Sequence, residues 1–251
     1  GCRKSFRKKS KTRTLRSLMA DIFNFFPLTI YKSKVGLNER DKKILINEIL
    51  NLEKNSQNTS LKSNNKSWTG DTQGHEFLHE NDKFKKLFDI IELHVKKYLD
   101  KLNIDSNLLS IYYSRAWATI SRKAENISPH KHMQSNLSFA YYLNLKKTDA
   151  KLVFFDESRH NEFLSGLFTS KSINKKNIIT KRDLSNTSTI LFEANEDEIV
   201  IFPSKTLHGT QSNINNEDRI SISADIIIHA KDSSGLEHLV PPIEKWKKFK
   251  N

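Results

Sequence analysis

A change in the spacing of apolar residues near residue 109 constrains the fold more than any other feature of this sequence. Before it, apolar residues recur at helical spacing, and after it they form short runs separated by polar or Asn-rich turns. We expect strands at 109–122, 137–145, 151–155, 189–193, 198–202, 206–211 and 218–229. A series of strands that follows a helical region predicts a mainly β fold, a sandwich or barrel with helices packed outside.

Two helices are expected ahead of these strands. Residues 38–54 begin with Asn38 as a candidate cap, and residues 82–102 carry an apolar stripe along one face. The apolar stretch 22–32 is expected to form a first strand. The polar stretch 157–187 predicts a long loop between strands, and loops of this length are often functional.

The charge of the chain is concentrated at its beginning. The formal net charge is +13, and residues 1–18 hold eight Lys or Arg and no acidic residue, which leaves +5 for the remainder. We interpret residues 1–18 as a solvated basic tail, upstream or expression-derived, with Met19 as the natural start. A nucleic-acid-binding arm and a targeting peptide are the alternatives for this segment.

Cysteine content and hydropathy exclude several classes of protein. Cys2 is the only cysteine, so neither an intrachain disulfide nor a cysteine-based metal site is possible. No run approaches the roughly 18–20 consecutive apolar residues of a membrane span. No apolar segment of a secretion signal follows the basic N-terminus. We therefore expect a cytoplasmic protein without a membrane partner.

Three histidines and an arginine lie where the strand pattern is strongest. His130 and His132 stand just ahead of one strand, and His208 stands at the start of another. Residues i and i+2 of an extended segment project to the same side, so two imidazoles can reach one metal ion. Arg219 and Ser221 share one face of the last strand, where a guanidinium and a hydroxyl can bind a carboxylate.

The order of these motifs resembles the non-haem Fe(II)- and 2-oxoglutarate-dependent dioxygenases, and more narrowly their bacterial and phage 2-oxoglutarate–Fe(II) oxygenase branch. The matching segments are Pro129–His132, Ser135–Leu143, Phe202–His208 and Arg219–Ser221. The resemblance implies a double-stranded β-helix, a jelly-roll or cupin-like barrel, flanked by N-terminal helices. It also implies a single domain over residues 19–230, with a helical layer at 38–102, a β core at 109–230 and a C-terminal tail at 231–251.

The same resemblance assigns roles to individual residues. His130 and His208 would bind Fe(II), and Arg219, helped by Ser221, would hold the far carboxylate of 2-oxoglutarate. Tyr141 or Tyr142 would add a hydroxyl, and strand alternation allows only one of them to face the site. The implied cofactors are Fe(II), 2-oxoglutarate and O2, with ascorbate as an additional reductant.

One position departs from the pattern of the superfamily. The broad superfamily has a carboxylate two residues after the first histidine, whereas this chain has His132. Two alternatives follow: His132 is the third metal ligand, or it lies behind the ligands and water or Asp156 completes the coordination.

The function expected is hydroxylation of a C–H bond, with release of succinate and CO2. The substrate expected is a small molecule or a peptidyl residue. The alternatives are a cupin-type metal-binding barrel without oxygenase activity and a zinc peptidase that uses His75-Glu76-x-x-His79. A nucleic-acid-binding module would rest mainly on residues 1–18.

Overall fold

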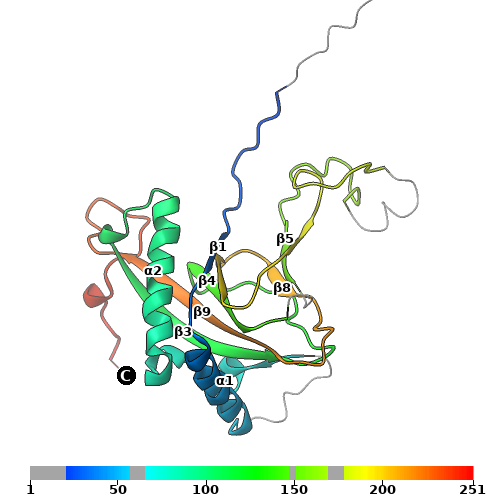
Figure 1. The fold of residues 1–251 in the computed structure, drawn as a ribbon. Coiled ribbons are helices and arrows are strands. Elements are labelled where there is room, and N and C mark those ends of the chain that lie inside the picture. Colours follow the sequence, from blue (N-terminus) through cyan, green and yellow to red (C-terminus); the bar gives the residue numbers. More distant parts are fainter. Residues whose placement is uncertain (1–20, 57–65, 147–150, 169–177, 251) are drawn as a thin grey trace, which may run out of the picture.

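The computed structural model describes residues 21–56, 66–146, 151–168 and 178–250. The predicted basic tail and Met19 lie outside the described residues. Within them, two α-helices lie against one side of a large sheet, and a small sheet lies beyond its other side (Figure 1).

Both predicted helices are confirmed. Helix α1 spans Glu39–Lys54, and the Asn38 side chain caps it by accepting a hydrogen bond from the backbone N–H of Asp41. Helix α2 spans Lys85–Lys101 and is preceded by a 3₁₀ turn at Asp82–Phe84. Four further 3₁₀ turns are described, at Gly70–Thr72, Leu78–Glu80, Ser106–Leu108 and Ile243–Lys245.

The strands from residue 109 onward form as predicted, with ends that differ by at most two residues. The described strands are β1 (Tyr31–Lys34), β2 (Trp68–Thr69), β3 (Leu109–Ser121), β4 (Leu137–Asn144), β5 (Leu152–Phe155), β6 (Thr189–Phe192), β7 (Glu198–Pro203), β8 (His208–Thr210) and β9 (Arg219–Ala230).

The predicted first strand at 22–32 is wrong in position. Only its last two residues belong to β1, and residues 21–30 have no regular structure. Pro27 lacks an N–H for a sheet, and Phe26 has a φ of 57° that no strand accommodates. The segment leaves the body of the molecule (Figure 1), with Phe23 and Phe25 exposed.

The strands form two antiparallel sheets. The large sheet has the order β1-β7-β4-β9-β3-β2, and the small sheet has the order β6-β5-β8. Neighbours in these orders are far apart in sequence, so the sheet register brings distant motifs together.

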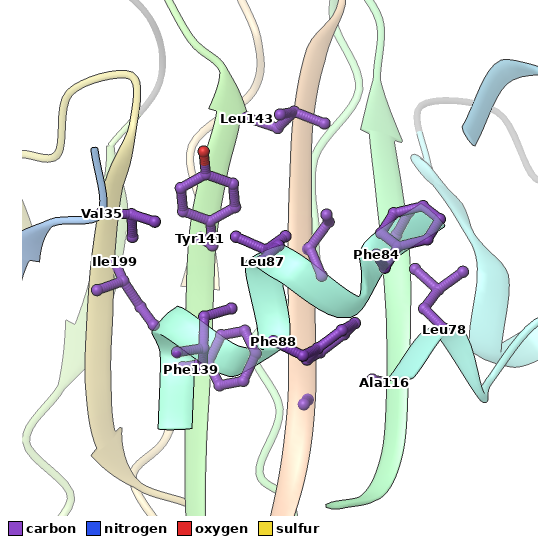
Figure 2. Close-up of a cluster of buried hydrophobic side chains, with 14 of the residues drawn as sticks. Val35, Leu78, Phe84, Leu87, Phe88, Ala116, Phe139, Tyr141, Leu143 and Ile199 are labelled. Carbon is purple, nitrogen blue, oxygen red and sulfur yellow. The ribbon is translucent and has the colours of Figure 1, made fainter. Parts of the chain in front are cut away.

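The main core lies between the helices and one face of the large sheet. Leu87 and Phe88 of α2 pack among Phe139 and Tyr141 of β4 and Ile199 of β7 (Figure 2). All five are nearly inaccessible to water, and each such side chain stabilises the fold by about 1.5–3 kcal/mol on burial.

The opposite face of the large sheet lines a cavity of about 1140 Å³ that opens to the surface. Alternation on β3 directs Trp117 and Thr119 into the cavity and Ala118 into the core. Its partner β9 directs Ser221 and Ser223 into the cavity in the same way. The floor of the cavity therefore carries several hydroxyl side chains beside Trp117, whereas the other face of the same strands is apolar.

The C-terminal segment packs partly against β9, where Trp246 stacks on His229 with ring centroids 5.2 Å apart. Among the helices of the described residues, none has the length and apolar character required to cross a bilayer.

Candidate metal centre

A backbone bridge joins two of the predicted metal ligands. The N–H of His130 donates to the carbonyl of His208 at 2.8 Å, and the N–H of His208 donates back at 3.0 Å. This antiparallel bridge places the two imidazole ring centroids 4.4 Å apart. The Gly209 Cα lies so close to the facing chain that an added Cβ would be 2.9 Å from the Ile127 carbonyl oxygen.

His132 completes the group. Its N–H donates to the Ser204 carbonyl at 3.0 Å, and its ring stacks on Trp117 at 5.7 Å between centroids. One nitrogen from each of His130, His132 and His208 lies within 4.8 Å of the corresponding nitrogens of the other two. Among the described residues, these three histidines are the only group placed to hold a metal ion in this way.

The orientation of the rings fits a metal centre. Each Nδ1 faces an oxygen that accepts hydrogen bonds: the Ser128 carbonyl at 2.9 Å for His130, the Thr206 carbonyl at 2.8 Å for His208, and Asp225 Oδ1 at 2.9 Å for His132. A neutral imidazole that donates from Nδ1 has its lone pair on Nε2. Three lone pairs therefore converge.

The spacing of two of these nitrogens supports the same conclusion. The Nε2 atoms of His130 and His132 are 3.0 Å apart. Two lone pairs repel each other at this distance unless a cation lies between them. Imidazole nitrogens lie about 2.1 Å from a bound transition metal, so two nitrogens at right angles would be about 3 Å apart. The residues present fit a divalent metal of the kind that imidazole prefers.

The electrostatic environment of His130 and His208 favours their neutral forms. Burial lowers the pKa of His208 to about 3, and the neighbouring His130 and His132 also lower it. The pKa of His130 is lowered as well, again mainly by burial. Because only a neutral imidazole can bind a metal, both histidines are ready to bind without losing a proton.

Arg219 lies at the part of the cavity next to the histidines. It is 3% exposed, and its Nη2 donates to Thr210 Oγ1 at 2.9 Å and to Ser121 Oγ at 3.0 Å. Thr210 is two residues beyond His208 on β8, so one strand joins the candidate metal ligand to the guanidinium. Ser221 also lines the cavity, two residues along β9 from Arg219.

The structure distinguishes the two tyrosines of β4. Tyr142 lines the cavity, beside the small sheet. Tyr141 points to the helix side of the sheet (Figure 2), where its hydroxyl donates to Asp197 Oδ1 at 3.1 Å. The prediction of a cofactor-binding role for Tyr141 is therefore corrected: alternation directs it away from the cavity.

Asp156 does not join the histidines. Its carboxylate accepts hydrogen bonds from Ser158 and from the N–H of Arg159, in the turn that follows β5. It is neither part of the histidine group nor part of the cavity lining. Of the two alternatives for the third ligand, the geometry favours His132.

The segment His75-Glu76-x-x-His79 does not form the helix that a zinc peptidase requires. Phe77 makes an isolated bridge to Ala116, and Leu78–Glu80 is a 3₁₀ turn. The His79 ring stacks on Tyr113 instead, with centroids 5.6 Å apart. The two histidines therefore do not share a helix face as a zinc-binding pair would.

Sequence reasoning missed Asp225, which binds His132. The alternation that placed Arg219 and Ser221 on one face reaches Asp225 two steps after Ser221, so the pattern on β9 contained this signal. It also missed Trp117, because nothing local to β3 shows that it faces His132.

Comparison with known proteins agrees with this geometry. Residues 115–225 match the model of a family described as "Putative 2OG-Fe(II) oxygenase". The matched segment contains the three histidines, Arg219 and Asp225. No curated protein matches the chain.

Several solved structures share the fold at low sequence identity. The epimerase SnoN, in complex with Fe3+, alpha ketoglutarate and nogalamycin RO, has a TM-score of 0.53 and 12% identity, with 88% of each chain covered. AviO1 from Streptomyces viridochromogenes Tue57 has a TM-score of 0.51 and 10% identity, over 80% of this chain and 90% of that one. HygX from Streptomyces hygroscopicus, with nickel, 2-oxoglutarate and hygromycin B bound, has a TM-score of 0.50 and 8% identity, over 79% and 82%.

The fold is thus the double-stranded β-helix, here with a cavity that holds three convergent imidazoles beside a buried arginine. Within this fold, residues 115–225 are similar to the family described as "Putative 2OG-Fe(II) oxygenase".

Proposed function

We propose that this chain is an Fe(II)- and 2-oxoglutarate-dependent oxygenase that hydroxylates a C–H bond of its substrate. One observation carries the proposal: ring nitrogens of three histidines converge within 4.8 Å of one another, and a strand of three residues joins this group to the Arg219 guanidinium. Fe(II) with bound 2-oxoglutarate supplies the oxidation, in which R–H, O2 and 2-oxoglutarate give R–OH, succinate and CO2.

The side chains around the cavity would bind the metal and orient the co-substrate. His130, His132 and His208 would hold the metal on one side, which leaves the positions toward the cavity for 2-oxoglutarate and O2. The Arg219 guanidinium, with the hydroxyls of Ser221 and Tyr142 nearby, offers a planar donor pair for the far carboxylate of the co-substrate.

The experiment is an anaerobic titration of the purified protein with Fe(II) and 2-oxoglutarate. We expect the visible charge-transfer band of an iron-bound 2-oxo acid, and after admission of air, succinate in amounts that follow the 2-oxoglutarate consumed. His130→Ala and His208→Ala should both abolish the band, because each removes one of the converging nitrogens.

His238→Ala is the matched control. Its side chain is 92% exposed in the C-terminal segment, and its removal should leave the band unchanged. A wild-type protein that forms no band, or an unchanged band in both site variants, would refute the proposed function.

The metal-binding barrel without oxygenase activity remains the rival hypothesis, and it predicts metal binding without any 2-oxoglutarate-dependent band.

We propose a small-molecule or peptidyl substrate for residues 19–230 acting as one domain, with no nucleic-acid or membrane partner. We also propose a cytoplasmic location with ascorbate as an additional reductant. The single cysteine supports a reducing compartment.

A further inference from the structure

Asp225, the acceptor for His132 Nδ1, is a fully buried carboxylate. It lies on β9 with no exposed surface, directly opposite Arg115 of β3 in the sheet register. Buried carboxylates are costly unless both oxygens are satisfied, so the partners of Asp225 show what holds it in place.

The two oxygens of Asp225 have different partners. Oδ2 accepts from Arg115 Nε at 3.1 Å and Nη2 at 2.5 Å, and from Gln134 Nε2 at 3.0 Å. Oδ1 accepts from His132 Nδ1 at 2.9 Å and from Ser135 Oγ at 3.1 Å. Arg115 therefore fixes the carboxylate from one side, and the carboxylate fixes the His132 ring from the other.

This contact decides which nitrogen of His132 carries the proton. Asp225 Oδ1 is an acceptor, so Nδ1 must donate and Nε2 must carry the lone pair. The carboxylate also makes the imidazole a more basic ligand. Nδ1 of His130 and Nδ1 of His208 each face a backbone carbonyl instead, so His132 is the one candidate ligand of the three whose Nδ1 faces a charged group.

We propose that Asp225 is the positioning residue that makes His132 the third metal ligand. This inference rests on the proposed function, and it explains the departure of this chain from the pattern with two histidines and a carboxylate. A carboxylate is therefore still present beside the proposed metal centre, but it binds the His132 imidazole instead of the metal.

The first test measures the tautomer of His132 in the metal-free protein by long-range ¹⁵N–¹H NMR. Wild type should show His132 protonated on Nδ1. In Asp225→Asn the single remaining oxygen should face Arg115, whose charged donors compete for it more strongly than imidazole does. The amide NH₂ would then face Nδ1, so His132 should become protonated on Nε2.

The second test measures Co(II) affinity by calorimetry. Asp225→Asn should weaken binding by about 10- to 100-fold, the usual effect of removing a partner behind a metal ligand. Asp197→Asn is the matched control, because Asp197 is also a buried aspartate with several donors but its carboxylate binds the Gly36 and Leu37 N–H groups on the helix side. Its Co(II) affinity should stay within twofold of wild type.

A double-mutant cycle separates this role from a general loss of structure. In a His132→Gln background, Asp225→Asn should weaken Co(II) binding no further, because the ligand through which it acts is already gone. An Asp225→Asn protein with wild-type Co(II) affinity, or an equal loss in both backgrounds, would overturn the inference.

The outcomes also separate the inference from the proposed function. If His130→Ala abolishes Co(II) binding while Asp225→Asn does not change it, only the role of Asp225 is wrong. If wild type binds Co(II) through an Asp225-dependent His132 but forms no Fe(II)–2-oxoglutarate band, only the oxygenase function is wrong.

Discussion

At the scale of single residues, Arg219 shows how burial makes a polar side chain useful for binding. Its guanidinium is withdrawn from water and held by the hydroxyls of Thr210 and Ser121. A planar donor group that is already oriented and desolvated loses little on binding a carboxylate.

We predict that Arg219→Ala lowers the affinity for 2-oxoglutarate by about 2–4 kcal/mol, because the far carboxylate would lose its charged partner in a desolvated site. The measurement is an anaerobic titration of the Fe(II) protein with 2-oxoglutarate, together with Co(II) affinity, which should not change. Arg159→Ala is the control, since Arg159 pairs with Glu162 at 3.1 Å and does not line the cavity. Equal effects of the two substitutions would contradict the prediction.

At the scale of elements, strand alternation decides which side chains belong to the site. On β4, Tyr142 faces the cavity and Tyr141 faces helix α2 (Figure 2). The close approach of β8 to the chain before β4 decides where His208 lies relative to His130.

The two tyrosines should respond differently to loss of the hydroxyl. Tyr142→Phe should raise the KM for 2-oxoglutarate several-fold, whereas Tyr141→Phe should leave it unchanged. Tyr141→Phe should instead lower the free energy of unfolding by about 1–2 kcal/mol, because it removes a buried hydrogen bond to the Asp197 carboxylate. Steady-state kinetics and urea unfolding would measure the two effects. A reversed pattern would show that Tyr141, and not Tyr142, faces the cavity.

Gly209→Ala should weaken metal binding without unfolding the protein. The added Cβ would meet the Ile127 carbonyl at 2.9 Å and Pro129 N at 3.1 Å, so β8 must move away and separate His208 from His130. We expect a loss of at least tenfold in Co(II) affinity. Gly235→Ala provides the comparison: its φ of 74° makes it strained, but its Cβ meets no atom within 4 Å. Gly235→Ala should lower only the free energy of unfolding. A wild-type Co(II) affinity in Gly209→Ala would contradict the prediction that the position of β8 controls metal binding.

At the scale of the whole molecule, buried neutral histidines make stability depend on pH. Burial lowers the pKa of His79, which packs against Phe88 and Tyr113, and of His94, which binds the Tyr31 hydroxyl. As the pH falls below 6.5, the unfolded chain takes up protons at these positions before the folded chain does. The free energy of unfolding should therefore fall with acidification.

We predict that metal-free protein loses stability between pH 7 and pH 5, and that His79→Phe loses less. Each buried histidine contributes up to about 1.4 kcal/mol per pH unit in this window, and phenylalanine cannot titrate. Urea unfolding at both pH values measures the difference. Equal losses in wild type and variant would show that His79 is protonated in the folded state.

Whether an element could be predicted from the sequence depends on how far apart in the chain the residues that stabilise it lie. The strands after residue 109 and the helices before it were predictable because period and capping are local properties. The prediction of a strand at 22–32 was wrong because the extent of this strand depends on pairing with β7, about 170 residues later. Only Tyr31–Lys34 pair with β7.

The alternating faces of β3, β4 and β9 follow from local residue order, which also indicates the histidines, serines and arginine that can share a site. The pairing of His130 with His208, the exposure of Tyr142 to the cavity and the contact of Asp225 with His132 follow instead from long-range packing. These facts depend on sheet register and ring orientation. They arise from contacts between segments tens of residues apart, which no local pattern encodes.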